Sequence, residues 1–90
     1  MTAFENELRD KLLKRLNLTH VDPATVTSDT ALFGEGGMGL DSLDALEVCI
    51  LVEQSWGITI AVAERNRAVM GTLGNLALFV QQNLHRDQKP

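Results

Sequence analysis

The sequence has one cysteine, few aromatic residues and no long apolar run. Because Cys49 has no partner in the chain, no intramolecular disulfide can form, and its place in an apolar stretch predicts a buried core residue. No segment offers the about 20 consecutive apolar residues that a bilayer requires, and the N-terminal MTAFENELRD lacks the apolar run of a signal peptide. We therefore expect a cytoplasmic protein without membrane insertion.

Basic residues are absent from the middle of the chain. No Lys or Arg occurs between Arg15 and Arg65. The acids in that segment are Asp22, Asp29, Glu35, Asp41, Asp44, Glu47, Glu53 and Glu64. An acidic segment of this kind repels nucleic-acid phosphates and attracts proteins with basic patches. We therefore expect protein partners and no nucleic-acid binding.

The composition favours a single small helical domain. The 90 residues suffice for one thin core, and 44% hydrophobic residues with only 4% aromatics are typical of an aliphatic helical bundle. We predict an all-α fold with one domain over residues 1–85, a frayed tail over residues 86–90 and a monomeric state.

Local signals place the first helix and a long loop. Thr2 and Glu5 have the spacing of a capping box, so a helix should begin near Ala3. Turn-forming residues then predict a structured loop over residues 17–39. Its expected apolar anchors to the core are Val21, Val26, Leu32 and Phe33.

A second helix is predicted over residues 43–56, with Asp41 as its N-cap and Gly57 at its end. An extended connector and a brief helical turn over residues 62–68 should follow. Thr72 is positioned to cap a last helix.

The stretch GEGGMGLDSLDALEV, residues 34–48, begins with a G-x-G-x-x-G pattern from Gly34 to Gly39. A dinucleotide-binding loop of this pattern needs a preceding buried strand and an acid about 20 residues later. Residues 30–33 are too few for such a strand, and Thr59 stands near the place of the acid. The glycines therefore indicate a flexible loop before a helix.

Ser42 in the same stretch does not have the pattern of a hydrolase nucleophile. A nucleophile elbow needs glycine two residues after the serine, where this chain has Asp44. His20 and His85 lie in segments expected to be exposed or terminal, and no triad pattern includes them. The acids lack calcium-loop spacing, and one cysteine with two distant histidines makes no zinc site. No catalytic residue and no metal site are expected.

The sequence GLDSLDALEV, followed by an apolar helix ending in Trp56 and Gly57, resembles the phosphopantetheine attachment region of acyl carrier proteins. The resemblance covers nearly the whole chain, because the predicted helices and the long loop follow the family's order. It implies a four-helix bundle of acyl-carrier-protein type, with a long loop between helices 1 and 2 and a short third helix.

The resemblance also implies that Ser42 receives 4′-phosphopantetheine from coenzyme A, with Asp41 engaging the phosphopantetheinyl transferase. The chain would be no enzyme. It would hold acyl groups as thioesters on the arm and shuttle them between acyl-loading, ketosynthase and related enzymes of fatty-acid or polyketide-type synthesis. The docking surface implied for these partners consists of Leu43, Asp44, Leu46, Glu47 and Ile50.

Two features depart from the common fatty-acid carrier pattern. Residues 35–38 lengthen the loop, and Arg65 and Arg67 place positive charge near the third helix. The longer loop is similar to stand-alone carriers of bacterial specialised pathways, such as aryl polyene or other polyketide-like systems. Gly36 and Gly37 are expected to act as a hinge that presents the serine, and alanine at both should cost little core stability.

Other functions fit the same residues. An aminoacyl or peptidyl carrier, or a carrier for an acid such as D-alanine, would have the same fold. A different class is an unmodified helical adaptor that binds a partner through residues 43–50. In such an adaptor Ser42 would simply help to cap a helix.

Overall fold

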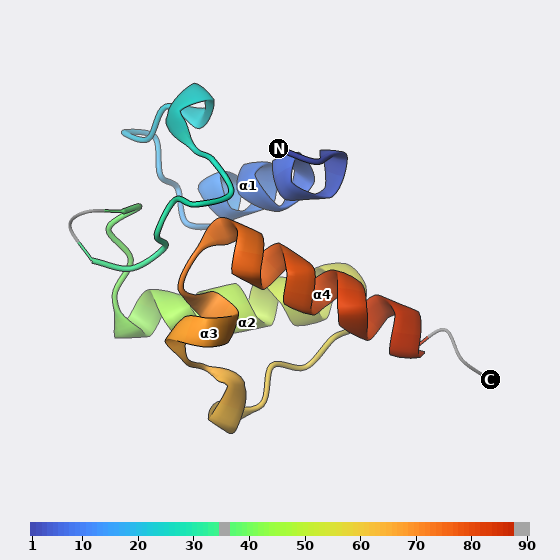
Figure 1. Cartoon of the computed structure of the whole chain (residues 1–90). Coiled ribbons are helices and arrows are strands. Elements are labelled where there is room, and N and C mark those ends of the chain that lie inside the picture. Colours follow the sequence, from blue (N-terminus) through green and yellow to red (C-terminus); the bar gives the residue numbers. More distant parts are fainter. Residues whose placement is uncertain (35–36, 88–90) are drawn as a thin grey trace.

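The computed structural model describes residues 1–34 and 37–87. Within these ranges the chain is helical and forms no β-strand, so the predicted all-α fold is confirmed (Figure 1). The elements are α1 (Ala3–Arg15), the 3-10 turn η1 (Pro23–Thr25), α2 (Ser42–Trp56), the 3-10 turn η2 (Val62–Glu64), α3 (Arg67–Met70) and α4 (Leu73–Asp87). No helix in these ranges has the length and apolar character to cross a membrane. Part of the predicted tail, residues 88–90, lies outside the described residues.

Helix ends occur where local sequence signals predict them. At the start of α1, the Thr2 amide donates to Glu5 Oε1 at 2.8 Å and the Glu5 amide donates to Thr2 Oγ1 at 3.1 Å. Gly57 ends α2 in the left-handed conformation, with a φ of 72° that glycine adopts without steric cost. Thr72 Oγ1 accepts a hydrogen bond from the Asn75 amide at 3.1 Å, which caps α4.

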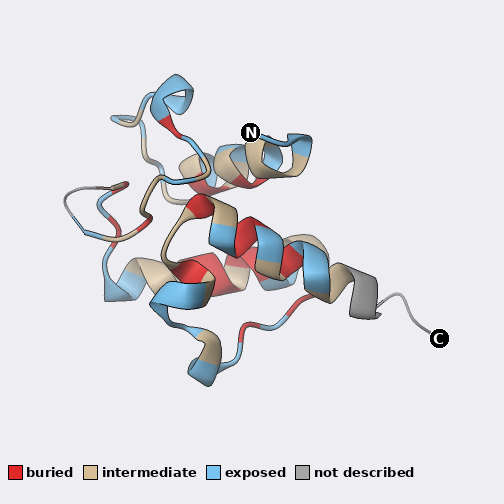
Figure 2. Cartoon of the chain, in the orientation of Figure 1, coloured by how far each residue is buried: buried red, intermediate tan, exposed pale blue. Residues whose placement is uncertain are grey.

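The core forms where the apolar faces of α1, α2 and α4 meet (Figure 2). Side chains with no exposed surface there are Leu8, Leu12, Val48, Val52, Leu76 and Val80. Burial of each such side chain is worth about 1.5–3 kcal/mol, so this junction supplies much of the driving force for folding. Cys49 is also buried, as predicted. Burial raises the pKa of its thiol, and the charge of the neighbouring Arg65 partly offsets that rise.

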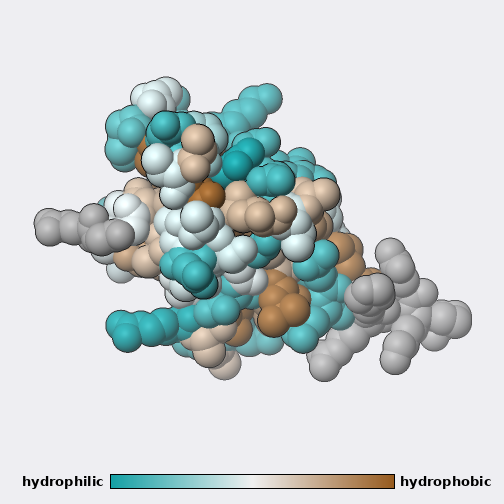
Figure 3. All heavy atoms as spheres, turned by 45° about the horizontal axis from the view of Figure 1, so that its top comes forward, coloured by the Kyte–Doolittle hydropathy of each residue, from teal (hydrophilic) through white to brown (hydrophobic). Residues whose placement is uncertain are grey.

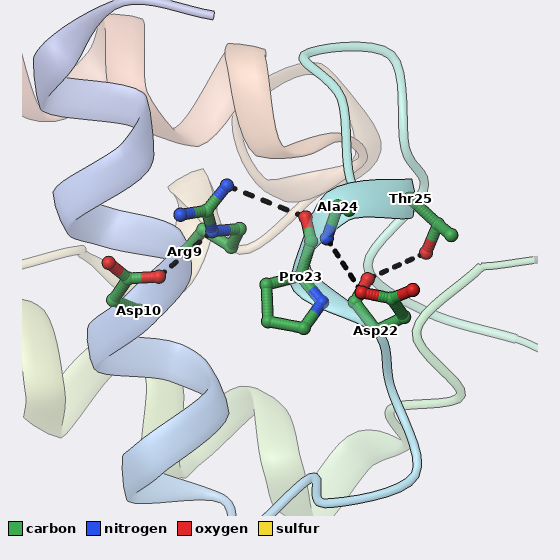
Figure 4. A network of polar contacts seen from close by, with 6 residues as sticks. All are labelled: Arg9, Asp10, Asp22, Pro23, Ala24 and Thr25. Carbon is green, nitrogen blue, oxygen red and sulfur yellow. Dashed lines mark hydrogen bonds and ion pairs between the residues drawn. The ribbon is translucent and has the colours of Figure 1, made fainter.

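Polar contacts attach the first part of the long loop to α1. Arg9 lies between Asp10, whose Oδ1 accepts from Arg9 Nε at 2.9 Å, and Pro23, whose carbonyl accepts from Arg9 Nη1 at 3.4 Å (Figure 4). Asp22 Oδ1 caps η1 by accepting from the Ala24 amide at 3.0 Å. The loop is therefore an ordered unit at this end.

Ser28 connects the middle of the loop to two helices. Its hydroxyl donates to Glu5 Oε2 of α1 at 2.7 Å, and its carbonyl accepts from the Gly74 amide of α4 at 2.8 Å. Hydrogen bonds from the Thr2 backbone and the Ser28 hydroxyl hold the pKa of Glu5 below its usual value. The four predicted apolar anchors all pack against the core: Val21, Val26, Leu32 and Phe33.

The end of the loop pairs with the junction between α3 and α4. The Leu32 amide donates to the Gly71 carbonyl at 3.1 Å, and the Leu40 amide donates to the Leu32 carbonyl at 3.2 Å. The Met38 amide donates to the Ala31 carbonyl at 2.9 Å. Because the buried Leu40 directly precedes the N-cap of α2, these contacts fix the start of α2 beside α3.

Candidate functional site

Asp41 organises the start of α2. Its Oδ1 accepts hydrogen bonds from the amides of Leu43 at 3.0 Å and Asp44 at 3.1 Å, and Asp44 Oδ2 accepts from the Asp41 amide at 3.0 Å. This reciprocal arrangement satisfies amides that have no partner within the helix. The predicted N-cap is confirmed.

Ser42 is the first residue of α2 and is exposed. The cap is made by the Asp41 side chain, so helix capping does not account for the Ser42 hydroxyl. A primary hydroxyl at an exposed helix start is sterically open to an enzyme that would modify it.

A groove of about 900 Å³ lies beside Ser42, between α2, α3 and the end of the loop. Its apolar part is lined by Phe33, Leu40, Ala45 and Met70. Its polar part is lined by Asp41, Ser42, Arg65, Asn66, Arg67, Thr72 and Asn75. Figure 1 shows α3 lying next to the beginning of α2, in agreement with this lining. The groove therefore offers apolar surface next to the serine and positive charge on α3.

The described glycines of the loop, Gly34, Gly37 and Gly39, form hydrogen bonds within the loop. The amides of Gly37 and Gly39 both donate to the Gly34 carbonyl, at 3.2 and 3.1 Å, and the Gly34 amide donates to the Leu40 carbonyl at 3.2 Å. Gly34 and Gly39 have φ values of 85° and 79°, so they serve a tight turn. Amides engaged inside the loop are not directed at a nucleotide. Gly36, the central glycine of the motif, lies outside the described residues.

The apolar residues of the predicted docking surface differ in exposure. Leu43 is 77% exposed and Leu46 is 50% exposed, although both are on a helix that packs into the core. Ile50, one turn beyond Leu46, is half-buried. Figure 3 shows a face on which hydrophilic residues predominate and hydrophobic residues occur as separate patches. Two exposed leucines therefore lie within the first two turns of α2, close in sequence to Ser42.

The acidic residues of that surface have partners within the chain. Asp44 completes the capping box, and Glu47 Oε2 accepts from Arg15 Nε at 3.1 Å. Arg15 Nη1 also donates to Gln54 Oε1 at 2.7 Å, which ties α1 to α2 at a second point. The Glu47 side chain remains 46% exposed, so the pair is worth at most about 1 kcal/mol. The spacing of Asp44 and Glu47 in the sequence did not predict these contacts within the chain, and their assignment to the docking surface stays a prediction.

Among the described residues, no histidine lines the groove beside Ser42. His20 is exposed and lies outside the groove, and the side chain of His85 is outside the described part. The described residues hold no cluster of His, Cys, Asp or Glu that could bind a metal ion. The groove itself was not predicted, because its lining comes from the loop, α2, α3 and α4, which are distant in the sequence.

Comparison with known proteins does not identify a family. The chain matches no protein-family model, and a search of curated proteins finds no significant match.

Proposed function

We propose that the protein is a discrete acyl carrier in which 4′-phosphopantetheine is attached to Ser42. The observation that carries the proposal is the exposed Ser42 hydroxyl at the start of α2, beside an apolar groove and next to two exposed leucines. The D-S-L-D-x-x-E pattern of residues 41–47 supports it, because this pattern resembles the attachment motif of acyl carrier proteins. The four-helix bundle of that family is the fold we assign on the same grounds.

In the modification, the Ser42 oxygen attacks the phosphorus of coenzyme A that bears the pantetheine group. A new phosphoester bond forms, the pyrophosphate bond breaks, and adenosine 3′,5′-bisphosphate leaves, while the transferase accepts the hydroxyl proton. The thiol at the end of the arm then holds acyl groups as thioesters, so the chemistry belongs to the cofactor and to the partner enzymes. Ketosynthase and acyl-loading enzymes of fatty-acid or polyketide type are the partners this function requires.

The proposal is tested by incubating the protein with coenzyme A and several phosphopantetheinyl transferases. Intact-mass spectrometry should show a gain of one phosphopantetheine group per chain, and peptide mapping should place it on Ser42. Absence of any gain with all of the transferases would overturn the carrier function.

An unmodified helical adaptor is the second candidate, because the exposed Leu43 and Leu46 could serve as a binding surface without any modification. The same mass measurement separates the two functions, since an adaptor would remain unmodified.

Replacement of Asp41 separates its capping role from its expected role with the transferase. Asp41→Asn keeps an oxygen that can accept from the amides of Leu43 and Asp44, so thermal stability should change little. Asp41→Ala should lower the free energy of unfolding by about 1 kcal/mol. If the carboxylate engages the transferase, both variants should be modified more slowly than wild type. A wild-type modification rate for Asp41→Asn would limit Asp41 to capping.

Leu43 and Leu46 provide a cleaner test of the docking surface than the acids. Leu43→Ala and Leu46→Ala remove exposed apolar side chains without disturbing the capping box or the Arg15 ion pair. Together they should lower kcat/KM of the transferase about tenfold or more, since central apolar contacts dominate interface energies. Leu78→Ala is the matched control, because Leu78 is 55% exposed on α4. An equal effect of all three substitutions would contradict a docking role.

A further inference from the structure

Arg65 and Arg67 form no ion pair with a carboxylate among the side chains that the structure describes. Arg65 and Arg67 both line the groove, and both are exposed. Among the described side chains, those of residues 1–34 and 37–84, ion pairs join Arg9 to Asp10 and Arg15 to Glu47. The groove also contains the Asp41 carboxylate beside Ser42, but no ion pair joins it to Arg65 or Arg67, so both arginines can meet an anionic ligand.

Two other polar side chains on the groove, those of Asn66 and Thr72, are already engaged. Asn66 Oδ1 accepts from the Val69 amide at 3.2 Å, and Asn66 Nδ2 donates to the Ala63 carbonyl at 2.9 Å. Thr72 Oγ1 is used in the cap of α4. The two guanidinium groups are thus the principal donors that α3 and its N-cap region present to a ligand in the groove.

The chemistry of the groove suits a ligand with an apolar body and an anionic end. Its apolar lining is formed by Phe33, Leu40, Ala45 and Met70. Ligand sites of this kind combine apolar walls with a few polar groups that fix orientation. A guanidinium group presents parallel N–H donors that match the two oxygens of a carboxylate.

Arg65 is better placed to bind the far end of a phosphopantetheine arm than the phosphodiester that would join the arm to Ser42. Arg65 and Ser42 both line the groove. The charge of Arg65 also opposes the rise in the pKa of the Cys49 thiol, and Cys49 is about two helical turns, or about 10 Å, beyond Ser42 along α2. A phosphodiester attached to Ser42 would instead be held at the helix start, close to the Asp41 carboxylate. If the arm attached to Ser42 folds back into the groove, the acyl group at its end can reach Arg65.

We propose that the groove binds acyl groups that end in a carboxylate, and that Arg65 and Arg67 recognise the negative charge. The inference rests on the proposed carrier function for its biological setting, since the acyl group would arrive on the arm of Ser42. The preference itself is a property of the unmodified protein and is measured without modification.

The test compares two pantetheine thioesters with acyl chains of equal length, succinyl-pantetheine and butyryl-pantetheine. The succinyl chain ends in a carboxylate, and the butyryl chain ends in a methyl group. Titration of isotope-labelled, unmodified full-length protein, monitored by amide NMR, should show shifts over residues 65–75. The succinyl thioester should bind about two- to fivefold more tightly, the range expected of exposed ion pairs.

Charge variants decide whether the arginines are responsible. Arg65→Gln with Arg67→Gln should remove the preference for succinyl-pantetheine. Lys11→Gln with Lys14→Gln is the control, because it removes the same charge from α1, away from the groove, and should preserve the preference. Circular dichroism establishes that each variant is folded.

Equal affinity for the two thioesters, or a preference that persists in the arginine double variant, would overturn the proposal. A further titration compares 4′-phosphopantetheine with pantetheine, which lacks the phosphate, and measures whether the arginines bind the phosphate of the arm. If arginine-dependent binding is found only for the phosphate, the carboxylate assignment is wrong and the arginines serve the phosphodiester. Failure of Ser42 modification would overturn the carrier function separately, because these titrations use unattached probes.

Discussion

Exchange of Ser42 for alanine should abolish phosphopantetheinylation completely and leave thermal stability unchanged. The hydroxyl is the only atom group that the substitution removes, and without it no phosphoester can form at this position. The helix start should persist because Asp41, and not Ser42, accepts from the amides of Leu43 and Asp44. Alanine is also a good helix former, so the first turn of α2 loses nothing. Intact-mass spectrometry and a thermal melt measure both parts of the expectation.

Ser55→Ala is the matched control, since Ser55 lies near the other end of α2 and does not line the groove. This variant should be modified at the wild-type rate. A mass gain that persists in Ser42→Ala would place the attachment elsewhere and contradict the proposed site. A loss of stability in Ser42→Ala would show that the hydroxyl has a structural role beyond the cap that Asp41 provides.

The parts of the fold that sequence predicted are those encoded by neighbouring residues. The capping box of Thr2 and Glu5, the N-cap Asp41 and the terminating Gly57 each act within a few residues, so their spacing alone identifies them. The exposed serine at the start of α2 is predicted for the same reason. Its chemical role depends on a resemblance and remains a proposal.

The parts that sequence missed depend on residues far apart in the chain. Glu47 pairs with Arg15, which is 32 residues away, and nothing in the sequence around Glu47 predicts this contact. The periodicity of α2 contains no information about which residue of α1 faces it. The groove is likewise assembled by the loop, α2, α3 and α4, and becomes recognisable only when these elements are packed together.

The paired acids also change how the acidic segment should act on partners. Asp44 accepts from the Asp41 amide and Glu47 from Arg15, so reversing both charges would disturb the helix start and the contact between α1 and α2. A slower reaction in such a variant would have two explanations. Substitution of the exposed leucines avoids this ambiguity, because their side chains are directed away from the core.

Gly37→Ala should destabilise the protein and slow modification of Ser42. A Cβ at this position would overlap the carbonyl oxygen of Ala31 and lie 2.6 Å from its carbonyl carbon. That carbonyl cannot move freely, because it accepts from the Met38 amide and Ala31 bridges to Thr72 beside α4. Overpacking of this kind costs about 1–3 kcal/mol. The sequence-based expectation of little cost considered only buried side chains, whereas here glycine is needed for a close backbone approach.

Gly34→Asn is the matched control within the same loop. A Cβ at Gly34 meets nothing within 4 Å, and its φ of 85° is in the left-handed half of backbone space, which asparagine tolerates better than most residues. Urea unfolding should therefore show a clearly larger loss in the free energy of unfolding for Gly37→Ala than for Gly34→Asn. Because Met38 and Leu40 lie between Gly37 and the N-cap Asp41, a displaced loop should also move Ser42 away from its presented position and lower the modification rate several-fold. If Gly37→Ala has the free energy of unfolding and the modification rate of the wild type, the end of the loop does not position Ser42.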